Sequence, residues 1–345
     1  MHFKDPGRIK MFFKDANKKN FLVICREVLV LWVTKKEVPL YYFKHLYKKD
    51  IRNYRDYLAP KEVRRIHACA KLHRKEYNSI LHNKLSFALY CERSHIPSPA
   101  LISYNFKSRF FFKDAVRKIS DLGGMVAFYQ DVFESIDAAA IFFRPLSLRG
   151  GRGCFKIDRE NFSQQLRAEF ENLLNGDYTH TEVIHQHCDI DRIYDKSINT
   201  LRILTFMEGD NVEIVSSIIR IGTGGSFVDN ASSGGLFVGI HQETGTLMRT
   251  GYRHMRFGGG GVDRHPDTGF VFENFKVPFF KEACQAAMDA VRRIPDPLIG
   301  WDIALTPTGP TIIEGNSDAG FFMSDVAYGG LLKNAHMKRI ISVVK

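Results

Sequence analysis

The pattern of apolar and polar residues changes along the chain. Residues 1 to about 80 contain no glycine after Gly7 and are rich in helix formers and in Lys and Arg. We therefore expect a helical segment there. A further helix is expected over residues 83–95, and it must end at Ile96-Pro97 because proline disfavours helical backbone in the preceding residue.

Downstream, from Gly123 onward, strand-like apolar runs alternate with Gly, Asn and Asp turns. The pattern predicts hairpins that join residues 141–145 to 154–157 and residues 200–206 to 212–221, a strand over 236–240, and helices over 162–174 and 280–293. This mixture predicts an α+β fold behind a mostly helical N-terminal region.

The longest apolar stretch covers residues 21–33 and is interrupted by Arg26-Glu27. It is shorter than the roughly 20 residues that a membrane-spanning helix needs. The first interpretation is an amphipathic helix packed on the protein body. The second, suggested by Lys18-Lys19 and Lys35-Lys36 at its ends, is contact with an anionic membrane surface. With no secretory pattern at the N-terminus, we expect a cytoplasmic protein, with the inner face of the membrane as the alternative location.

Composition narrows the classes of function. The 345 residues predict about two domains. The six cysteines form no CxxC pair, which argues against a zinc module and a disulfide scaffold and fits a reducing compartment. The net charge of +11 suits nucleic acid, an anionic membrane or phosphorylated small molecules, and it does not choose between them.

Two strand patterns near the C-terminus are joined by residues 306–310, which have strong turn chemistry. If these five residues form the loop, Leu305 pairs with Thr311, and counting outward places Asp302 opposite Glu314.

Asn316 projects from the same face of its strand as Glu314, because the two are two residues apart. The oxygens of Asp302, Glu314 and Asn316 are hard donors that suit Mg²⁺ or Mn²⁺ bridging phosphates. Two carboxylates on one face would also repel each other without a cation. The alternative is a solvated polar face of an ordinary hairpin.

The loop over residues 144–153 is rich in glycine and arginine. It can turn successive backbone N–H groups toward phosphate oxygens, with Arg144, Arg149 and Arg152 supplying positive charge. It lacks the GK[ST] ending of a Walker A loop and is not GxGxxG. A flexible hairpin tip is the alternative.

The order of these motifs over residues 83–325 resembles the ATP-grasp superfamily of carboxylate–amine ligases, and within it the branch associated with sugar transfer and surface polysaccharides. The resemblance implies an ATP-grasp fold, in which two α+β subdomains clamp ATP. It divides the chain into a helical N-terminal region at 1–80, a central part with the glycine-rich ATP loop at 81–182, and a C-terminal subdomain with the metal site at 183–345. Its most specific mark is the Asp…Glu-x-Asn ending, here Asp302, Glu314 and Asn316.

The resemblance also implies which residues bind the nucleotide. Asn83-Lys84 is similar to the family's Asp-Lys, with Lys84 reaching the ATP phosphates, and Arg144 stands where the family has a nucleotide-contacting lysine. The remaining nucleotide-binding residues implied are Ser147, Gly150, Gly151 and Gly153 in the phosphate-covering loop, Glu182, Val183 and Ile184 in the hinge that reads adenine, and Asp189 at the ribose, with Asp191 as its alternative.

One family feature is absent, because Gly300 occupies the position of an arginine two residues before the metal aspartate. Arg202 and Arg220 are the candidates for its role of stabilising charge on the transferring phosphoryl group. A structural salt bridge is the alternative for either arginine. The substrate-side loop of the branch is similar to residues 228–235, which makes Asn230, Ser233 and Gly234 substrate-binding candidates, unless this segment is only a tight turn.

These features predict an ATP- and Mg²⁺-dependent ligase that forms an amide from a carboxylate and an amine through an acyl phosphate. By resemblance, the carboxylate belongs to a uronic acid or an amino acid in surface-polysaccharide biosynthesis. The first alternative is kinase-like transfer of phosphate to a sugar or small acid. The second is a basic protein that binds nucleic acid or a membrane surface through its first 80 residues. In the leading interpretation we expect no nucleic-acid partner.

Overall fold

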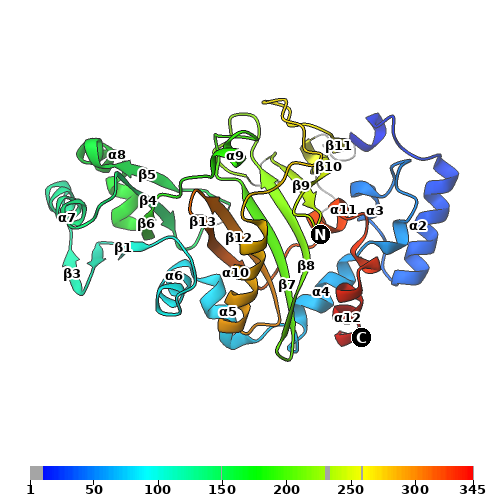
Figure 1. Ribbon diagram of the computed structural model, residues 1–345, viewed down its shortest axis with the longest axis horizontal. Coiled ribbons are helices and arrows are strands. Elements are labelled where there is room, and N and C mark those ends of the chain that lie inside the picture. Colours follow the sequence, from blue (N-terminus) through cyan, green and yellow to red (C-terminus); the bar gives the residue numbers. More distant parts are fainter. Residues whose placement is uncertain (1–10, 149, 230–233, 258, 345) are drawn as a thin grey trace.

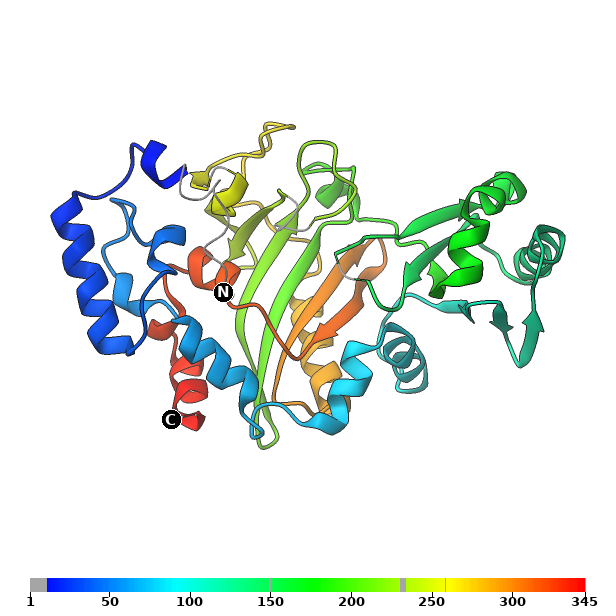
Figure 2. The ribbon, with the colours of Figure 1, turned by 180° about the vertical axis from the view of Figure 1, so that it is seen from behind.

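The computed structural model describes residues 11–148, 150–229, 234–257 and 259–344. Three parts follow one another along the long axis of the molecule (Figure 1): a small sheet with two helices, a larger central sheet, and a helical region at the opposite end. The view from behind shows the same order (Figure 2). The chain is therefore an α+β protein, as predicted, and its shape is elongated.

The N-terminal region is helical, as the sequence predicts. Its helices are α2 (Phe21–Lys35), α3 (Tyr42–His45), α4 (Pro60–Ala68), α5 (Lys75–His82) and α6 (Lys84–Arg93). Helix α2 begins where its apolar run begins, because the Asn20 side chain caps it by accepting a hydrogen bond from the Leu22 N–H at 2.9 Å. None of the helices in the described ranges has the length and apolarity needed to cross a bilayer.

The smaller sheet has six antiparallel strands in the order β3-β2-β1-β6-β4-β5. These are β1 (Leu101–Phe106), β2 (Arg109–Phe112), β3 (Ala115–Lys118), β4 (Ala140–Pro145), β5 (Phe155–Asp158) and β6 (Asp177–Glu182). Helices α7 (Leu122–Ser135) and α8 (Phe162–Asn175) pack on it through a common apolar core. The predicted β4–β5 hairpin and the helix at α8 are confirmed. Helix α7 was not predicted because Gly123-Gly124 lie in its first turn, where Asp121 caps it by accepting from the Gly124 N–H.

The larger sheet has seven antiparallel strands in the order β11-β10-β9-β8-β7-β12-β13. These are β7 (Thr200–Glu208), β8 (Asn211–Ile221), β9 (Leu236–Ile240), β10 (Leu247–Arg253), β11 (Gly261–Val262), β12 (Leu298–Thr306) and β13 (Gly309–Asn316). Helix α10 (Phe280–Arg293) contributes to the core on one face, together with Leu201 and Ile203. The predicted β7–β8 hairpin, strand β9 and helix α10 are confirmed.

The opposite face of this sheet changes character along β7. Leu204 and Phe206 pack in a core with residues of α4 and of the C-terminal helix α12 (Ala335–Val343). Arg202 lies on the same face, because it is two residues from Leu204, but beyond the reach of that apolar core. The face is therefore apolar where the N- and C-terminal helices cover it and charged where they do not.

Helix α6 ends at Arg93, the smaller sheet begins at Leu101 and β6 ends at Glu182. The division of the chain at residues 80 and 182 stays a prediction.

Candidate active site

A cleft of about 720 Å³ lies between the two sheets, with strands β4, β5 and β6 on one side and β7, β8, β12 and β13 on the other. Most of the predicted site residues line it: Lys84, Arg144, Ser147, Gly150, Gly151, Glu182, Ile184, Arg202, Arg220, Asp302, Glu314 and Asn316. The fold therefore gathers on one cleft residues that are up to 232 positions apart in the sequence.

Six predicted residues do not line the cleft: Arg152, Gly153, Val183, Asp189, its alternative Asp191, and Gly234. Asn230, Ser233 and Arg149 lie outside the described residues. Their predicted roles stay predictions.

The β12–β13 hairpin places Asp302 opposite Glu314, as predicted, but by a different route. The turn is tighter than expected, so Leu305 pairs with Pro310 instead of Thr311. A β-bulge at Ile313 then shifts the register by one residue. The two differences cancel at the position of the carboxylates.

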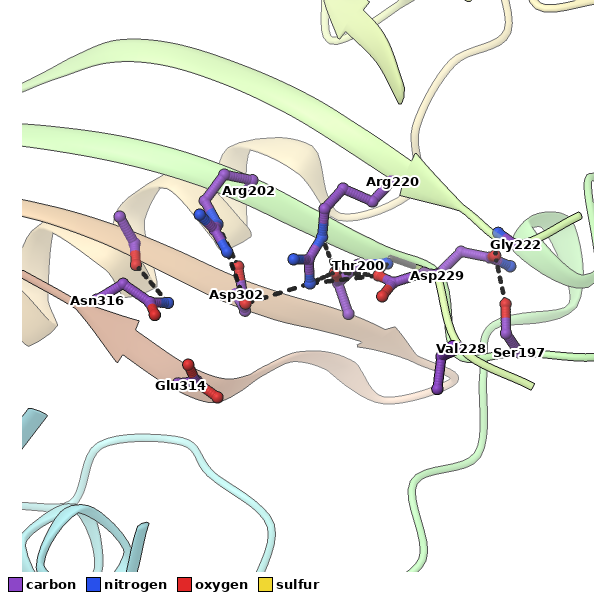
Figure 3. A network of polar contacts seen from close by, with 12 residues as sticks. Ser197, Thr200, Arg202, Arg220, Gly222, Val228, Asp229, Asp302, Glu314 and Asn316 are labelled. Atoms are coloured by element: carbon purple, nitrogen blue, oxygen red, sulfur yellow. Dashed lines mark hydrogen bonds and ion pairs between the residues drawn. The ribbon is translucent and has the colours of Figure 1, made fainter. Parts of the chain in front are cut away.

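The bulge also decides which way Glu314 points. Without it, side-chain alternation would place Glu314 on the face of Ile312, which is fully buried in the core beneath α10. Because the bulge inserts one extra residue, Glu314 points to the opposite face, and it lines the cleft together with Ile313 and Asn316. Figure 3 shows Glu314 and Asn316 beside Asp302 on the neighbouring strand.

Asp302 is bound by both candidate arginines (Figure 3). Arg202, its partner on β7, donates from Nε to Oδ1 and from Nη2 to Oδ2, the latter at 3.0 Å. Nη2 of Arg220 lies 3.2 Å from Oδ2 of Asp302 and 3.3 Å from Oδ2 of Asp229. All four side chains are nearly buried, so this is a desolvated network of two arginines and two aspartates.

Burial and neighbouring charge act in opposite directions on these groups. Burial acts to raise the pKa of Asp302, but Arg202 and Arg220 outweigh it and hold that pKa below its usual value. At Asp229 burial dominates and raises the pKa, although Arg220 and Thr200 oppose it. Burial would lower the pKa of Arg220, yet the surrounding carboxylates raise it above its usual value. Arg220 is thus a permanent cation in the site.

The sequence suggested that the two carboxylates would repel each other, but neighbouring arginines compensate their negative charge. Arg202 and Arg220 neutralise Asp302, and Nη2 of Arg144 lies 3.6 Å from a carboxylate oxygen of Glu314. The metal prediction therefore rests on the donors themselves and not on uncompensated charge.

The donors fit a hard divalent cation. Glu314 is 37% exposed on the cleft, and its ion pair with Arg144 is long. Asn316 donates its amide N–H to the Gly300 carbonyl at 3.3 Å, which directs the donor end of the amide to the protein and leaves its oxygen as the acceptor end. Each oxygen of Asp302 has more than one lone pair, so its arginine bonds do not exhaust them. Oxygen donors of this kind suit Mg²⁺ or Mn²⁺.

Lys84 and the glycine-rich loop approach the cleft together. Nζ of Lys84 donates to the carbonyls of Leu146 and Leu148, at 3.3 and 2.7 Å. Gly151 has φ +72°, and a Cβ there would overlap the Val228 side chain. The loop thus lies against Val228, in the segment that follows β8, and both line the cleft.

The predicted hinge follows β6, and both the backbone N–H and the side chain of Glu182 bind Ala100. Strand β6 ends at Glu182, whose carboxylate accepts from the Ala100 N–H at 3.0 Å. Asp189 lies on the short helix α9 (Cys188–Asp191) and pairs with Arg192 at 3.3 Å. His187 caps this helix by accepting at Nδ1 from the Asp189 N–H.

Among the cleft residues that the sequence analysis missed are Thr200, Asp229 and His82. Asp229 accepts from the backbone N–H of Thr200 at 3.0 Å and from its hydroxyl group, and Thr200 Oγ1 in turn accepts from Nη2 of Arg220 at 2.6 Å. His82 lines the cleft and lies 2.8 Å from the Ser317 hydroxyl. Asp229 lies within the predicted substrate loop, at residues 228–235, and this position is the one feature of the sequence that could have indicated a role in the site.

Little space is left for a side chain at Gly300, the position at which an arginine was expected from the resemblance. A Cβ at this position would lie 3.0 Å from Ala319 Cβ and 3.4 Å from Arg202 Cδ. Arg202 reaches Asp302 from the adjacent strand and occupies the space that a side chain at position 300 would enter.

No curated protein matches the chain by sequence. Among solved structures, it is similar to the ATP-grasp ligase PsnB in complex with a precursor variant, Mg and ADP, with 11% identity, a TM-score of 0.44, and coverage of 79% of this chain and 62% of that one. D-alanyl-alanine synthetase A from Vibrio cholerae has 14% identity, a TM-score of 0.45, and coverage of 79% and 68%. Biotin carboxylase from Campylobacter jejuni has 10% identity, a TM-score of 0.45, and coverage of 78% and 47%. This chain spans less than two thirds of the length of PsnB.

The profile of one protein family, described as sugar-transfer associated ATP-grasp, matches residues 64–340. The match includes both sheets, the cleft between them and every described residue of the arginine–aspartate network. This chain therefore belongs to the sugar-transfer associated ATP-grasp family.

Proposed function

We propose that the protein is an ATP-dependent ligase that joins a carboxylate to an amine. The observation that carries the proposal is the meeting of Glu314, Asn316 and the Asp302–arginine network with Lys84 and the glycine-rich loop on one cleft. Its volume of about 720 Å³ lies in the range of small-molecule sites.

Lys84, Arg144 and the N–H groups of Ser147, Gly150 and Gly151 bind the phosphates of ATP in this proposal. Asp302, Glu314 and Asn316 would hold Mg²⁺, or Mn²⁺, which neutralises charge on the phosphate oxygens when bound. The hinge at Glu182, Val183 and Ile184 contacts adenine, and Asp189 the ribose. Gly153 supplies the turn of the loop, with φ +70°.

The two network arginines act on the reacting phosphoryl group. Arg202 and Arg220 are held in place by Asp302 and Asp229, so their positive charge is oriented before substrate arrives. Such preorganised charge stabilises a transition state without reorganisation during the reaction. The proposal assigns them the stabilisation of charge that develops on the γ-phosphoryl oxygens.

The proposed chemistry has two steps. An oxygen of the acceptor carboxylate attacks the γ-phosphorus of ATP, the bond to the ADP oxygen breaks, and an acyl phosphate forms. The amine nitrogen then attacks the acyl carbon, the carbon–oxygen bond to phosphate breaks, and the amine loses a proton. Amide, ADP and phosphate are the products. No covalent bond to the protein is needed, so its contribution is binding and positioning.

The proposed acceptor is a uronic acid or an amino acid attached to a surface glycan, and the proposed process is polysaccharide biosynthesis. The family description, which associates these proteins with sugar transfer, supports a carbohydrate substrate. Asn230, Ser233 and Gly234 are the proposed contacts to this substrate.

The test measures ADP release with ATP, Mg²⁺ and pairs of candidate carboxylates and amines. Glu314→Gln should abolish turnover while the urea midpoint is retained. Glu282→Gln, on the exposed surface of α10 outside the cleft, is the matched control and should leave turnover unchanged. Unchanged turnover of Glu314→Gln would contradict the site.

The mass of the product separates ligation from phosphoryl transfer. An amide that forms only when the amine is present supports the ligase. A stable phosphorylated acid or sugar, formed without amine, would replace the ligase by the kinase-like alternative. Binding to nucleic acid with no affinity for ATP would contradict both.

A further inference from the structure

The outward face of α2 carries an exposed apolar stripe. The exposed fractions are 74% for Phe21, 76% for Leu22, 57% for Leu29, 53% for Trp32 and 68% for Val33. At 3.6 residues per turn, these five positions fall within an arc of about 120°. Half of the exposed large apolar side chains of the described residues, seven of fourteen, lie between residues 13 and 38. We call the five residues the α2 stripe.

The inward face of α2 is packed against the rest of the N-terminal region. Ile24 and Leu31 are buried in an aromatic-rich core that includes Tyr42. Glu27, the one acidic residue of the helix, is buried as well and accepts from Nζ of Lys19 and from the Tyr42 hydroxyl, each at 2.6 Å. The helix thus buries its acidic residue and one set of apolar residues, and it exposes a second apolar set on the face where an ordinary surface helix is polar.

Positive charge accompanies the stripe. Arg26 is exposed within the same side of the helix, Lys36 is exposed at its C-terminal end, and Lys14 is exposed before its N-terminal end, next to Phe13, which is 68% exposed. Helices that lie in the interface of an anionic membrane combine exposed aromatic and aliphatic side chains with Lys and Arg in this way.

We propose that the α2 stripe docks on the surface of a membrane that contains anionic lipids. Charge favours this occupant over a second copy of the chain, because the exposed charges beside the stripe, Arg26 and Lys36, are positive and self-association would bring two positive surfaces together. The position of α2 also suits it, since the helix lies at one end of the elongated molecule, with the larger sheet in the middle and the smaller sheet at the other end (Figure 1), and the cleft is lined by strands of these two sheets. A membrane contact through α2 leaves the cleft open.

Vesicles of phosphatidylcholine, with and without phosphatidylglycerol, test the proposal with the full chain. The wild type should sediment with the anionic vesicles and at least tenfold less with neutral ones, and raising the salt concentration should weaken binding. Trp32 is a built-in probe: it is half exposed, whereas Trp301, the second tryptophan, is fully buried. Its emission should shift to shorter wavelength on binding.

The variant Leu29→Glu/Val33→Glu should lose at least tenfold in affinity for anionic vesicles. Val116→Glu is a matched control, because Val116 is 60% exposed and lies on β3 in the smaller sheet. It should bind like the wild type. Circular dichroism and the urea midpoint check that both variants fold. ADP release without vesicles should be the same in both, so failure of docking and failure of the proposed ligase are separate results.

Three outcomes would overturn the proposal. The first is wild-type protein that does not sediment with anionic vesicles at low salt, and the second is a Leu29→Glu/Val33→Glu variant that sediments equally well. The third is a concentration-dependent dimer, seen by light scattering, that the same variant dissociates, which would assign the stripe to a second copy of the chain.

Discussion

Replacing Arg220 by methionine tests the central network of the site. Methionine keeps much of the apolar length of the side chain but removes the cation that lies 3.3 Å from Asp229 and 3.2 Å from Asp302. Asp302 keeps its two bonds to Arg202. Asp229 keeps only uncharged donors, the N–H and hydroxyl groups of Thr200. The cost should therefore fall mainly on Asp229.

The magnitude follows from the burial of the pair. Removing one partner of a buried ion pair costs about 3–5 kcal/mol of unfolding free energy. The two donors of Thr200 place Arg220→Met at the lower end, about 3 kcal/mol. In the same background, Asp229→Asn should restore about 1–2 kcal/mol, because an amide needs no cation. The substitution should thus be stabilising in the variant although it breaks the Arg220 pair in the wild type.

Urea unfolding followed by tryptophan fluorescence measures these differences. Arg192→Met is the matched control: Arg192 is 68% exposed, its pair with Asp189 lies on the surface, and its loss should change the unfolding free energy by less than about 0.5 kcal/mol. An Arg220→Met variant within about 0.5 kcal/mol of wild type would contradict a strong Arg220–Asp229 ion pair. So would an Asp229→Asn substitution that destabilises the variant as much as it does the wild type.

Three further predictions concern the loop and the buried acid. Gly151→Ala should raise the KM for ATP and lower the unfolding free energy by about 1 kcal/mol, because an L side chain is strained at φ +72° and its Cβ would overlap Val228 and displace the loop; an unchanged KM would argue against it. Lys84→Met should raise the KM for ATP roughly tenfold, since it removes a cation and the 2.7 Å bond to the Leu148 carbonyl. Burial raises the pKa of Asp325 to about 7, so the folded state retains a proton that the unfolded state releases. The unfolding free energy should fall by up to about 1.4 kcal/mol per unit as pH rises from about 4 to 7, and Asp325→Asn should remove this slope in urea titrations at several pH values.

Elements with a local signal were predictable from the sequence. Helix α10 and strand β9 have the predicted boundaries, and α2 begins at Phe21 as expected. Their spacing of apolar residues and their capping residues act over a few positions, so one segment of sequence contains the information. Helix α7 lacked this signal, since two glycines at its start lower the intrinsic preference for helix.

Which side chains of α2 are exposed could not be predicted from the sequence of the helix. Its apolar residues occur on all sides, so the sequence supported both packing on the body and contact with a membrane. Tertiary structure decided that Ile24 and Leu31 are buried and that Leu29 and Val33 are not.

The candidate site shows the same division. The kinds of group present can be identified in the sequence alone: an Asp…Glu-x-Asn ending, a glycine-rich loop and two arginines within apolar strands. How they combine depends on the fold, because the β7–β12 pairing joins Arg202 to Asp302 and the bulge at Ile313 turns Glu314 into the cleft. The fold also brings Asp229 to Arg220. Strand order and register depend on contacts between distant segments, which is why no local pattern could reveal these partners.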